Sequence, residues 1–322
     1  MIKPARIIVN LHPIKYLTEK SKKWILPGFH RVPLYEVIKF FGKQLKVSGL
    51  TERASAISFN FIMSIPPTCL FLFTLIPALP FVSKNNLKSE IHILLDDVLP
   101  SKIHDHTLVN FVNSFIDNTQ VGLISFSFLL SLFFASNAMM GVMRSFDKNY
   151  QGFQKRKGLN KRWVALKLTL VLFSLLLMYL MLLFTQGDIL NWLGIKDQIV
   201  KAIILSGKWL LILALIFYSF AFIYKYAPAT QKRWRLLSPG AIMATFLSIL
   251  TTIGFSAFLN NFDRYNVLYG SIGTIIASGT LIFLNSLVIL LGFELNVSIT
   301  SLRAMAEQRE LEEAKNPAPA TT

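Results

Sequence analysis

The sequence predicts an all-α membrane protein whose chain crosses the bilayer six times. Three properties of the 322-residue chain favour this fold class: 53% of its residues are hydrophobic, only 16% are charged, and its mean hydropathy is +0.51. A soluble domain carries roughly 25% charged residues. The single cysteine, Cys69, excludes a secreted scaffold held together by disulfides.

Six stretches are long and apolar enough to cross about 30 Å of hydrocarbon, which takes about 20 residues of helix. Lysines and arginines interrupt the region before the first stretch, so we expect no cleaved signal peptide there. The expected spans are residues 54–82, 121–142, 164–185, 206–224, 238–259 and 272–297. Together they form a membrane domain over 54–297, preceded by a cytoplasmic region at 1–53 and followed by a cytoplasmic tail at 298–322.

The distribution of basic residues predicts the orientation of these spans. The two terminal segments and the connections 143–163 and 225–237 hold 25 Lys and Arg residues, whereas the connections 83–120, 186–205 and 260–271 hold 6. Because Lys and Arg accumulate on the cytoplasmic side of membranes, both chain ends are expected in the cytoplasm.

This topology also accounts for the net charge of +16 without a nucleic-acid partner. The densest basic cluster is Lys155-Arg156-Lys157 with Lys161-Arg162-Trp163, directly before the third span. RNA binding would need aromatic residues interleaved with the basic ones, or a recognisable module, and neither is found. We therefore expect the cluster to contact anionic phospholipid head groups, not nucleic acid.

Three segments outside the spans have helical patterns. Residues 33–50 predict an amphipathic helix with one apolar face and a lysine face, which either lies on the membrane surface or packs against the bundle. Residues 83–120 hold two apolar runs separated by Pro100, which predicts an extracytoplasmic helical hairpin. In the tail, alternating charges up to Lys315 favour a solvated helix, and residues 316–322 are expected to be disordered.

Polar residues at membrane depth are costly, so they indicate either helix packing or function. In the sixth span Ser271, Ser278, Asn285 and Gly292 recur every seven residues and share one helical face. Packing is the favoured interpretation, and the lining of a substrate path is the alternative. Glu294 points to the opposite side, where we expect it to pair with a basic loop residue, with proton coupling as the alternative.

The first span has a polar face of its own. Asn60, Pro67 and Thr74 share it, Ser64 lies one turn from Asn60, and Pro66-Pro67 should bend or break the helix. The second span contributes Asn137. The candidate intramembrane residues are Asn60, Ser64, Pro67, Asn137, Ser278, Asn285 and Glu294.

The short outer connection before the sixth span is dense in hydrogen-bonding groups. Two tyrosines there suit the aromatic belt at the membrane interface, and a glycine permits a tight entry to the span. The candidate outer-loop residues are Asp263, Arg264, Tyr265, Asn266, Tyr269 and Gly270.

Signatures of catalysis are absent from the sequence. It has no phosphate-binding loop, no Gly-x-Ser-x-Gly elbow and no cysteine nucleophile with a base. His104-Asp105-His106 lacks the third ligand that a catalytic zinc site needs. We therefore predict no catalytic residue, no metal and no cofactor.

Several motifs in order resemble the YihY/virulence factor BrkB family of bacterial inner-membrane proteins over residues 35–300. They are Ala54-Ser55-Ala56-Ile57-Ser58-Phe59 with Ser64-Ile65-Pro66, then Tyr224-Lys225-Tyr226-Ala227-Pro228, Ser238-Pro239-Gly240-Ala241, Tyr265-Asn266 with Tyr269-Gly270-Ser271-Ile272-Gly273, and Leu291-Gly292-Phe293-Glu294-Leu295. The resemblance implies a six-span inner-membrane protein with a role in the cell envelope. The chain departs from the family's aromatic-rich pattern at Ser278-Gly279-Thr280-Leu281-Ile282-Phe283.

Some members of that family were once labelled ribonuclease BN, but this sequence argues against that activity. Metal-dependent nucleases of that kind use a His-x-His-x-Asp-His run, whereas Thr107 and Leu108 follow His106 here. The leading hypothesis is transport or flipping of a lipid or other amphiphile in the inner membrane. The alternative is a non-catalytic scaffold or assembly factor whose polar residues only pack helices.

Overall fold

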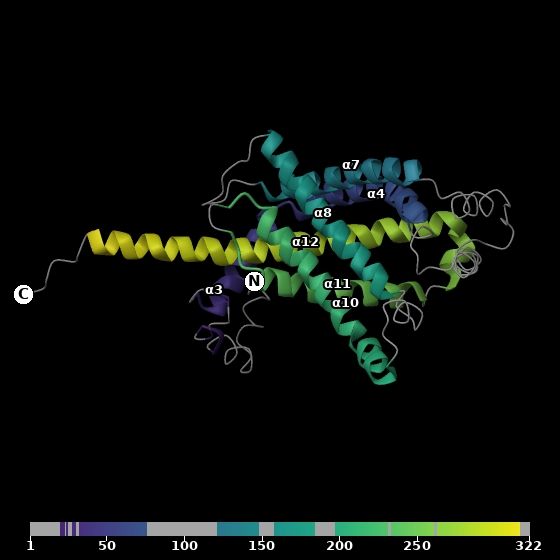
Figure 1. Ribbon diagram of the computed structural model, residues 1–322. Helices are drawn as coiled ribbons and strands as arrows, with labels where there is room; N and C mark the ends of the chain where they lie inside the picture. Colours follow the sequence, from purple (N-terminus) through teal and green to yellow (C-terminus); the bar gives the residue numbers. More distant parts are fainter. Residues whose placement is uncertain are drawn as a thin grey trace, which may run out of the picture.

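The computed structural model describes residues 20–22, 24, 28–29, 32–75, 121–147, 158–183, 197–230, 233–260 and 263–315, and most of these residues are helical (Figure 1). Six of the helices are long and apolar enough to cross a membrane, which confirms the predicted all-α, six-span fold class. The predicted outer hairpin, the Lys155–Lys157 cluster and residues 316–322 lie outside the described residues, and the orientation stays a prediction. The helices are α3 (Leu34–Val47), α4 (Leu50–Leu75), α7 (Val121–Phe146), α8 (Gly158–Leu183), α10 (Gln198–Tyr226), α11 (Pro239–Asn260) and α12 (Asp263–Lys315).

The six long helices form a closed ring in chain order. Each packs against the next, and α12 returns to pack against α4. Successive helices run in opposite directions, so the ring has two ends (Figure 1). At one end α4, α8 and α11 begin and α7 and α10 finish, and Arg53, Arg144, Lys161, Arg162 and Lys225 lie near it. We call this the basic end.

The last helix is much longer than a membrane span requires. α12 has 53 residues, which is about 80 Å at 1.5 Å per residue, and Figure 1 shows it continuing well beyond the other helices at the basic end. It begins at Asp263, so the helix already includes the predicted outer-connection residues Asp263–Gly270. No proline lies between Pro239 and Pro317, and Gly270 and Gly273 alone cost too little to stop a helix.

The first span stays helical through its two prolines. α4 runs without interruption through Pro66 and Pro67, so of the two predicted outcomes, a bend or a break, the break is not found. The two prolines leave the carbonyls of Ile62 and Met63 without N–H donors. Packing against α7 continues on the far side of the prolines, where Thr74 Oγ1 and Ser127 Oγ share a hydrogen bond of 3.1 Å. α4 therefore keeps its contact with α7 beyond the two prolines.

Packing differs between the two ends of the ring. The main buried cluster joins all six helices near the basic end, with Phe146, Tyr224 and Phe293 among its largest members. Towards the other end, no described side chain is buried on α11 from residue 246 to 259 or on α12 from 276 to 285. The first turns of α10 stand apart from the other helices in Figure 1. Buried side chains are therefore concentrated at the basic end, whereas α11 and α12 have exposed or partly buried side chains towards the other end, where Ser248 still contacts Asn285.

The amphipathic helix α3 packs against α12 near the basic end. Val37 and Ile299 are buried together in a small cluster, whereas Lys39, Lys43 and Lys46 are exposed. Part of its apolar face, at Leu34 and Val37, thus contacts α12, whereas Ile38 of the same face is exposed; contact with the membrane surface stays a prediction. Gly49 then takes a φ of +58°, a left-handed conformation that favours glycine, and this turn leads into α4.

Candidate functional site

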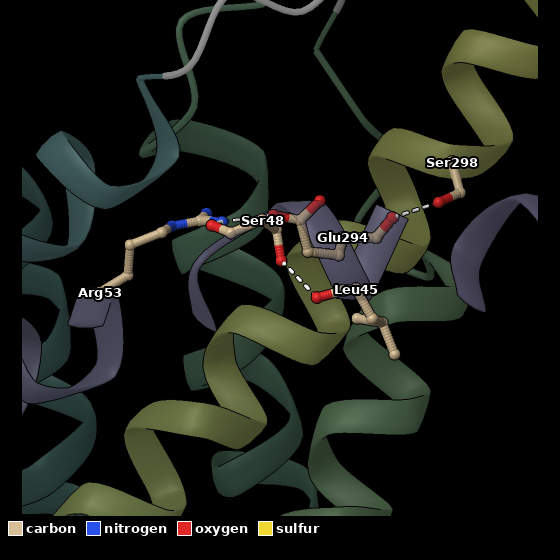
Figure 2. Close-up of polar contacts among 5 residues, drawn as sticks. All are labelled: Leu45, Ser48, Arg53, Glu294 and Ser298. Carbon is tan, nitrogen blue, oxygen red and sulfur yellow. Dashed lines mark hydrogen bonds and ion pairs between the residues drawn. The ribbon is translucent and has the colours of Figure 1, made fainter. Parts of the chain in front are cut away.

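The most deeply buried charge in the described part of the chain is Glu294 on α12, whose side chain is fully inaccessible. Its Oε1 accepts a hydrogen bond from Arg53 Nη1 on α4 at 2.5 Å. The same nitrogen donates to the Ser48 carbonyl at 3.2 Å, and the Ser48 hydroxyl donates to the Leu45 carbonyl. Figure 2 shows Arg53 reaching across to the turn after α3 and to Glu294. One ion pair therefore ties α3, α4 and α12 together.

The Arg53–Glu294 pair is not fully satisfied. Arg53 is 11% exposed, and its Nε and Nη2 have no hydrogen-bond partner among the described residues. Removing two charges from water costs free energy that their attraction repays only when the geometry and remaining hydrogen bonds are good. A buried ionisable pair at membrane depth is for that reason a candidate for function as well as for packing.

Aromatic rings surround the ion pair. Arg53 Cζ lies 5.9 Å from the centre of the Phe293 ring. Phe293 in turn stacks on Phe146 of α7, with ring centres 4.0 Å apart, and contacts Trp234 at 5.8 Å. Phe146 also meets Tyr224 of α10 at 6.2 Å. This aromatic layer links α7, α10 and α12 near the basic end.

α11 and α12 cross closely beside this layer because two glycines meet there. A Cβ added at Gly292 would lie 2.7 Å from the Gly240 carbonyl and would collide with the Tyr224 hydroxyl. That hydroxyl donates to the Ile289 carbonyl at 2.9 Å. Asn296 Oδ1 accepts from the Gly240 backbone N–H at 2.8 Å. Gly292, from the predicted seven-residue stripe, therefore serves helix packing.

The three predicted amides lie at three different helix contacts. Asn60 of α4 approaches Gly141 of α7 and donates to the Ala56 carbonyl at 2.6 Å. Asn137 of α7 accepts from Arg162 Nη1 of α8 at 2.5 Å. Asn285 of α12 accepts from the Ser248 hydroxyl of α11 at 2.5 Å. Each amide thus has its own neighbouring helix, and these contacts do not gather the three side chains into one site.

The remaining predicted residues differ in burial and in hydrogen bonding. Ser64 is buried and donates to the Phe61 carbonyl at 2.6 Å, Pro67 is buried, and Ser278 is exposed. The side chains of Asp263, Arg264, Tyr265, Asn266 and Tyr269, and Gly270 with them, fall among those that the structure does not describe. Among the described residues, no group of three His, Cys, Asp or Glu side chains is placed to hold a metal ion. The His104–His106 pair lies outside that part of the chain.

The sequence predicted a basic loop residue as the partner of Glu294 without naming it, and the partner is Arg53, the last residue of the predicted cytoplasmic segment 1–53. The signal was present: Arg53 lies in the first turn of α4, at the same end of the ring as Glu294. A single acidic residue in the last span and a basic residue at the start of the first span form a complementary pair once the ring closes.

Six apolar helices form a closed ring, and a buried Arg–Glu pair and stacked aromatic rings join them at the basic end. This arrangement defines a polytopic helical membrane protein. The family described as virulence factor BrkB matches residues 42–318, and the chain belongs to this family. Among solved structures, none matches the chain significantly.

Several bacterial proteins are similar to this chain, the first two below over most of their length. The ribonuclease-like protein YfkH of Bacillus subtilis is 25% identical over 263 residues, covering 80% of this chain and 92% of YfkH. The UPF0761 membrane protein IL2447 of Idiomarina loihiensis is 24% identical, covering 81% of this chain and 90% of that protein. A UPF0761 membrane protein of Pseudoalteromonas translucida is 36% identical over 81 residues, 25% of this chain and 27% of that protein.

Proposed function

We propose that this membrane protein moves a lipid or other amphiphile across or out of the bacterial inner membrane. The observation that carries the proposal is the difference between the two ends of the ring. A transporter needs a surface on which an amphiphile can enter and a barrier that prevents leakage. The exposed apolar side chains of α11 supply the surface, and the densely packed basic end supplies the barrier.

The end of the ring opposite the basic end exposes both apolar and hydroxyl-bearing side chains, which an amphiphile can contact. Phe246, Leu250 and Ile253 of α11 are exposed, and the hydroxyl-bearing Thr252 and Ser278 are exposed at the same end of the ring. Acyl chains pack against the apolar side chains, and the Ser278 hydroxyl offers a hydrogen bond to a polar group. The Thr252 hydroxyl donates to the Ser248 carbonyl at 2.8 Å and can still accept a hydrogen bond. Membrane helices lack a hydrophobic drive for tight association in lipid, so we expect α11 and α12 to part at low cost where no side chain is buried between them.

In this proposal the barrier at the basic end opens when the Arg53–Glu294 ion pair breaks. Arg53 and Glu294 join two helices that are neighbours only through ring closure, and two of the Arg53 nitrogens stay without partners in the described part of the chain. In this proposal the pair breaks when α4 and α12 separate. Anionic phospholipids contact the basic segments around this end, and no nucleic acid or catalytic activity is involved.

Reconstitution tests the proposal. Vesicles that contain the purified chain and a fluorescent phospholipid are treated with a membrane-impermeant quencher, with and without an ion gradient. We expect the inner-leaflet label to become quenched faster than in protein-free vesicles. We expect Glu294→Gln to raise that rate, because it removes a charge that holds the basic end closed. Quenching equal to that of protein-free vesicles under both conditions would refute transport.

A scaffold is the second candidate, and the length of α12 favours it. The helix continues to Lys315, far past the basic end, with Glu307, Leu311 and Glu312 exposed. Such an extension offers a surface to a protein partner. Crosslinking followed by purification distinguishes the two functions: one stoichiometric protein partner indicates a scaffold, whereas co-purifying lipid indicates transport.

A further inference from the structure

Arg162 of α8 points in an unusual direction for a basic residue near a helix end. α8 begins at Gly158, and the neighbouring Lys161 pairs with Asp147, just after the end of α7. Arg162 instead reaches Asn137, which lies nine residues before the α7 terminus at Phe146. That separation is about 13 Å at 1.5 Å per residue. The guanidinium is therefore directed along α7 towards the membrane interior, away from the basic end.

Two general tendencies oppose this orientation. Side chains on a helix tilt towards its N-terminus, which for α8 is the basic end, and long basic side chains near membrane boundaries extend towards water. Two contacts keep Arg162 in this orientation despite these tendencies. Its Nη1 donates to Asn137 Oδ1 at 2.5 Å, and its Cζ lies 4.9 Å from the centre of the Phe133 ring.

The guanidinium keeps most of its binding capacity in this position. It has five N–H donors, and in the described part of the chain Asn137 is its single hydrogen-bond partner. No carboxylate pairs with Arg162 there, and its side chain is only partly buried. A cation at membrane depth without a counter-charge is costly, and a bound anion would relieve that cost. A planar guanidinium matches the oxygens of phosphate especially well.

An exposed apolar stripe leads along α7 to this cation. Phe126, Leu129 and Phe133 are 61%, 64% and 53% exposed. Their spacing of three and four residues places them on one helix face, and Asn137 continues the same face one turn later. From the far end of α7 towards the basic end, the face is therefore apolar first and then ends in an amide with a guanidinium. This order matches an acyl chain followed by a charged head group.

We propose that Arg162 binds the phosphate of a phospholipid whose acyl chain lies along Phe126, Leu129 and Phe133. Asn137 and Phe133 act as positioning residues that hold the guanidinium at this depth. The inference rests on the proposed transport function and gives its substrate class, an amphiphile with a phosphate head group. The same chemistry would bind soluble phosphate, so the test includes both.

Native mass spectrometry of the full chain in detergent measures binding of phosphatidylglycerol to the wild type and to three variants. Arg162→Gln should weaken binding by about tenfold or more, because charge-assisted hydrogen bonds are lost. Arg162→Lys should weaken it by less, because a point charge remains without the planar donor set. Lys167→Gln is the matched control, since Lys167 is exposed on the same helix, and it should bind within about twofold of the wild type. Equal weakening by Lys167→Gln, or none by Arg162→Gln, would overturn the proposal.

Two further measurements keep the test independent of variant folding. A phospholipid with a photoreactive acyl chain should label the wild-type chain within residues 126–137 in preference to α11, and even labelling of both segments would overturn the site. Inorganic phosphate at the lipid concentration should leave the bound phospholipid in place, and its displacement would assign the site to free phosphate. Binding that requires Arg162 in a protein that does not flip lipid would refute transport and retain the site. Flipping with binding unaffected by Arg162→Gln would refute the site and retain transport.

Discussion

Arg53 and Glu294 are 241 positions apart in the chain and meet at 2.5 Å across the closure of the helix ring. The pair lies where an unpaired charge is expensive, since Glu294 is fully buried and Arg53 nearly so. The pair contributes to stability less through attraction between the two charges than because leaving either charge buried and unpaired costs free energy. This difference between pairing and isolation can be measured by substitution.

Replacing Glu294 by Leu should lower the free energy of unfolding by about 3–5 kcal/mol, because Arg53 is left buried and charged without its counter-charge. Replacing both residues by Leu should cost much less than the sum of the two single changes. Denaturant unfolding in detergent micelles measures both effects. The exposed Arg303–Glu307 pair is the control, and Arg303→Ala should cost at most about 1 kcal/mol. A loss below about 1 kcal/mol for Glu294→Leu would contradict the structural role of the pair.

At the scale of elements, the crossing of α11 and α12 depends on the absence of side chains at two positions. Gly240 and Gly292 face each other, and Tyr224 of α10 fills the remaining space with its hydroxyl. Small residues let membrane helices approach closely and replace the missing hydrophobic drive with van der Waals contact. The same crossing places Glu294, two residues after Gly292, against α4.

Gly292→Ala should therefore destabilise the protein by about 1–3 kcal/mol, because the added methyl group meets the Gly240 carbonyl at 2.7 Å and forces the helices apart. Gly254→Ala on α11 is the matched control: nothing lies within 4 Å of its added Cβ, so alanine should be neutral or slightly stabilising. Thermal unfolding of both variants in the same detergent compares them. Equal midpoints for the two variants would mean that the close crossing does not contribute to stability.

At the scale of the whole molecule, ring closure in chain order fixes which surfaces face each other. Six antiparallel spans bring both ends of the membrane domain to the basic end, where α3 and the extension of α12 also lie (Figure 1). The excess of Lys and Arg in the segments at this end predicts that it faces the cytoplasm.

Cysteine labelling tests that orientation in intact cells. The chain has one cysteine, so Cys69→Ser provides a cysteine-free background. Single cysteines at Lys39 on α3 and Glu312 on α12 should resist a membrane-impermeant maleimide until the cells are opened. A cysteine at Asp197, exposed before α10 at the other end, should react at once and serves as the control. Labelling of only one of positions 39 and 312 in intact cells would contradict the six-span topology.

The sequence by itself determined that this protein lies in a lipid bilayer and how many spans it has. Hydrophobic length and the low content of charged residues are local properties, and hydrocarbon imposes them on each span separately. It also indicated that Gly292 and Asn285 lie on a packing face and that Glu294 points elsewhere. It did not determine the course of the helices through Pro66-Pro67 or through Asp263–Gly270, since neighbouring helices decide whether a weak point breaks a helix.

Only the tertiary structure decided which side chains pair with one another across the helices. Arg53 opposite Glu294, Arg162 beneath Phe133 and the aromatic layer around Phe293 all depend on which helix lies beside which. Several basic residues near one end of the ring have the charge and the reach to pair with Glu294, so composition and spacing leave the choice open. Ring closure between α4 and α12 brings Arg53 within 2.5 Å of it, because side-chain partners are selected by three-dimensional contact and not by position in the chain.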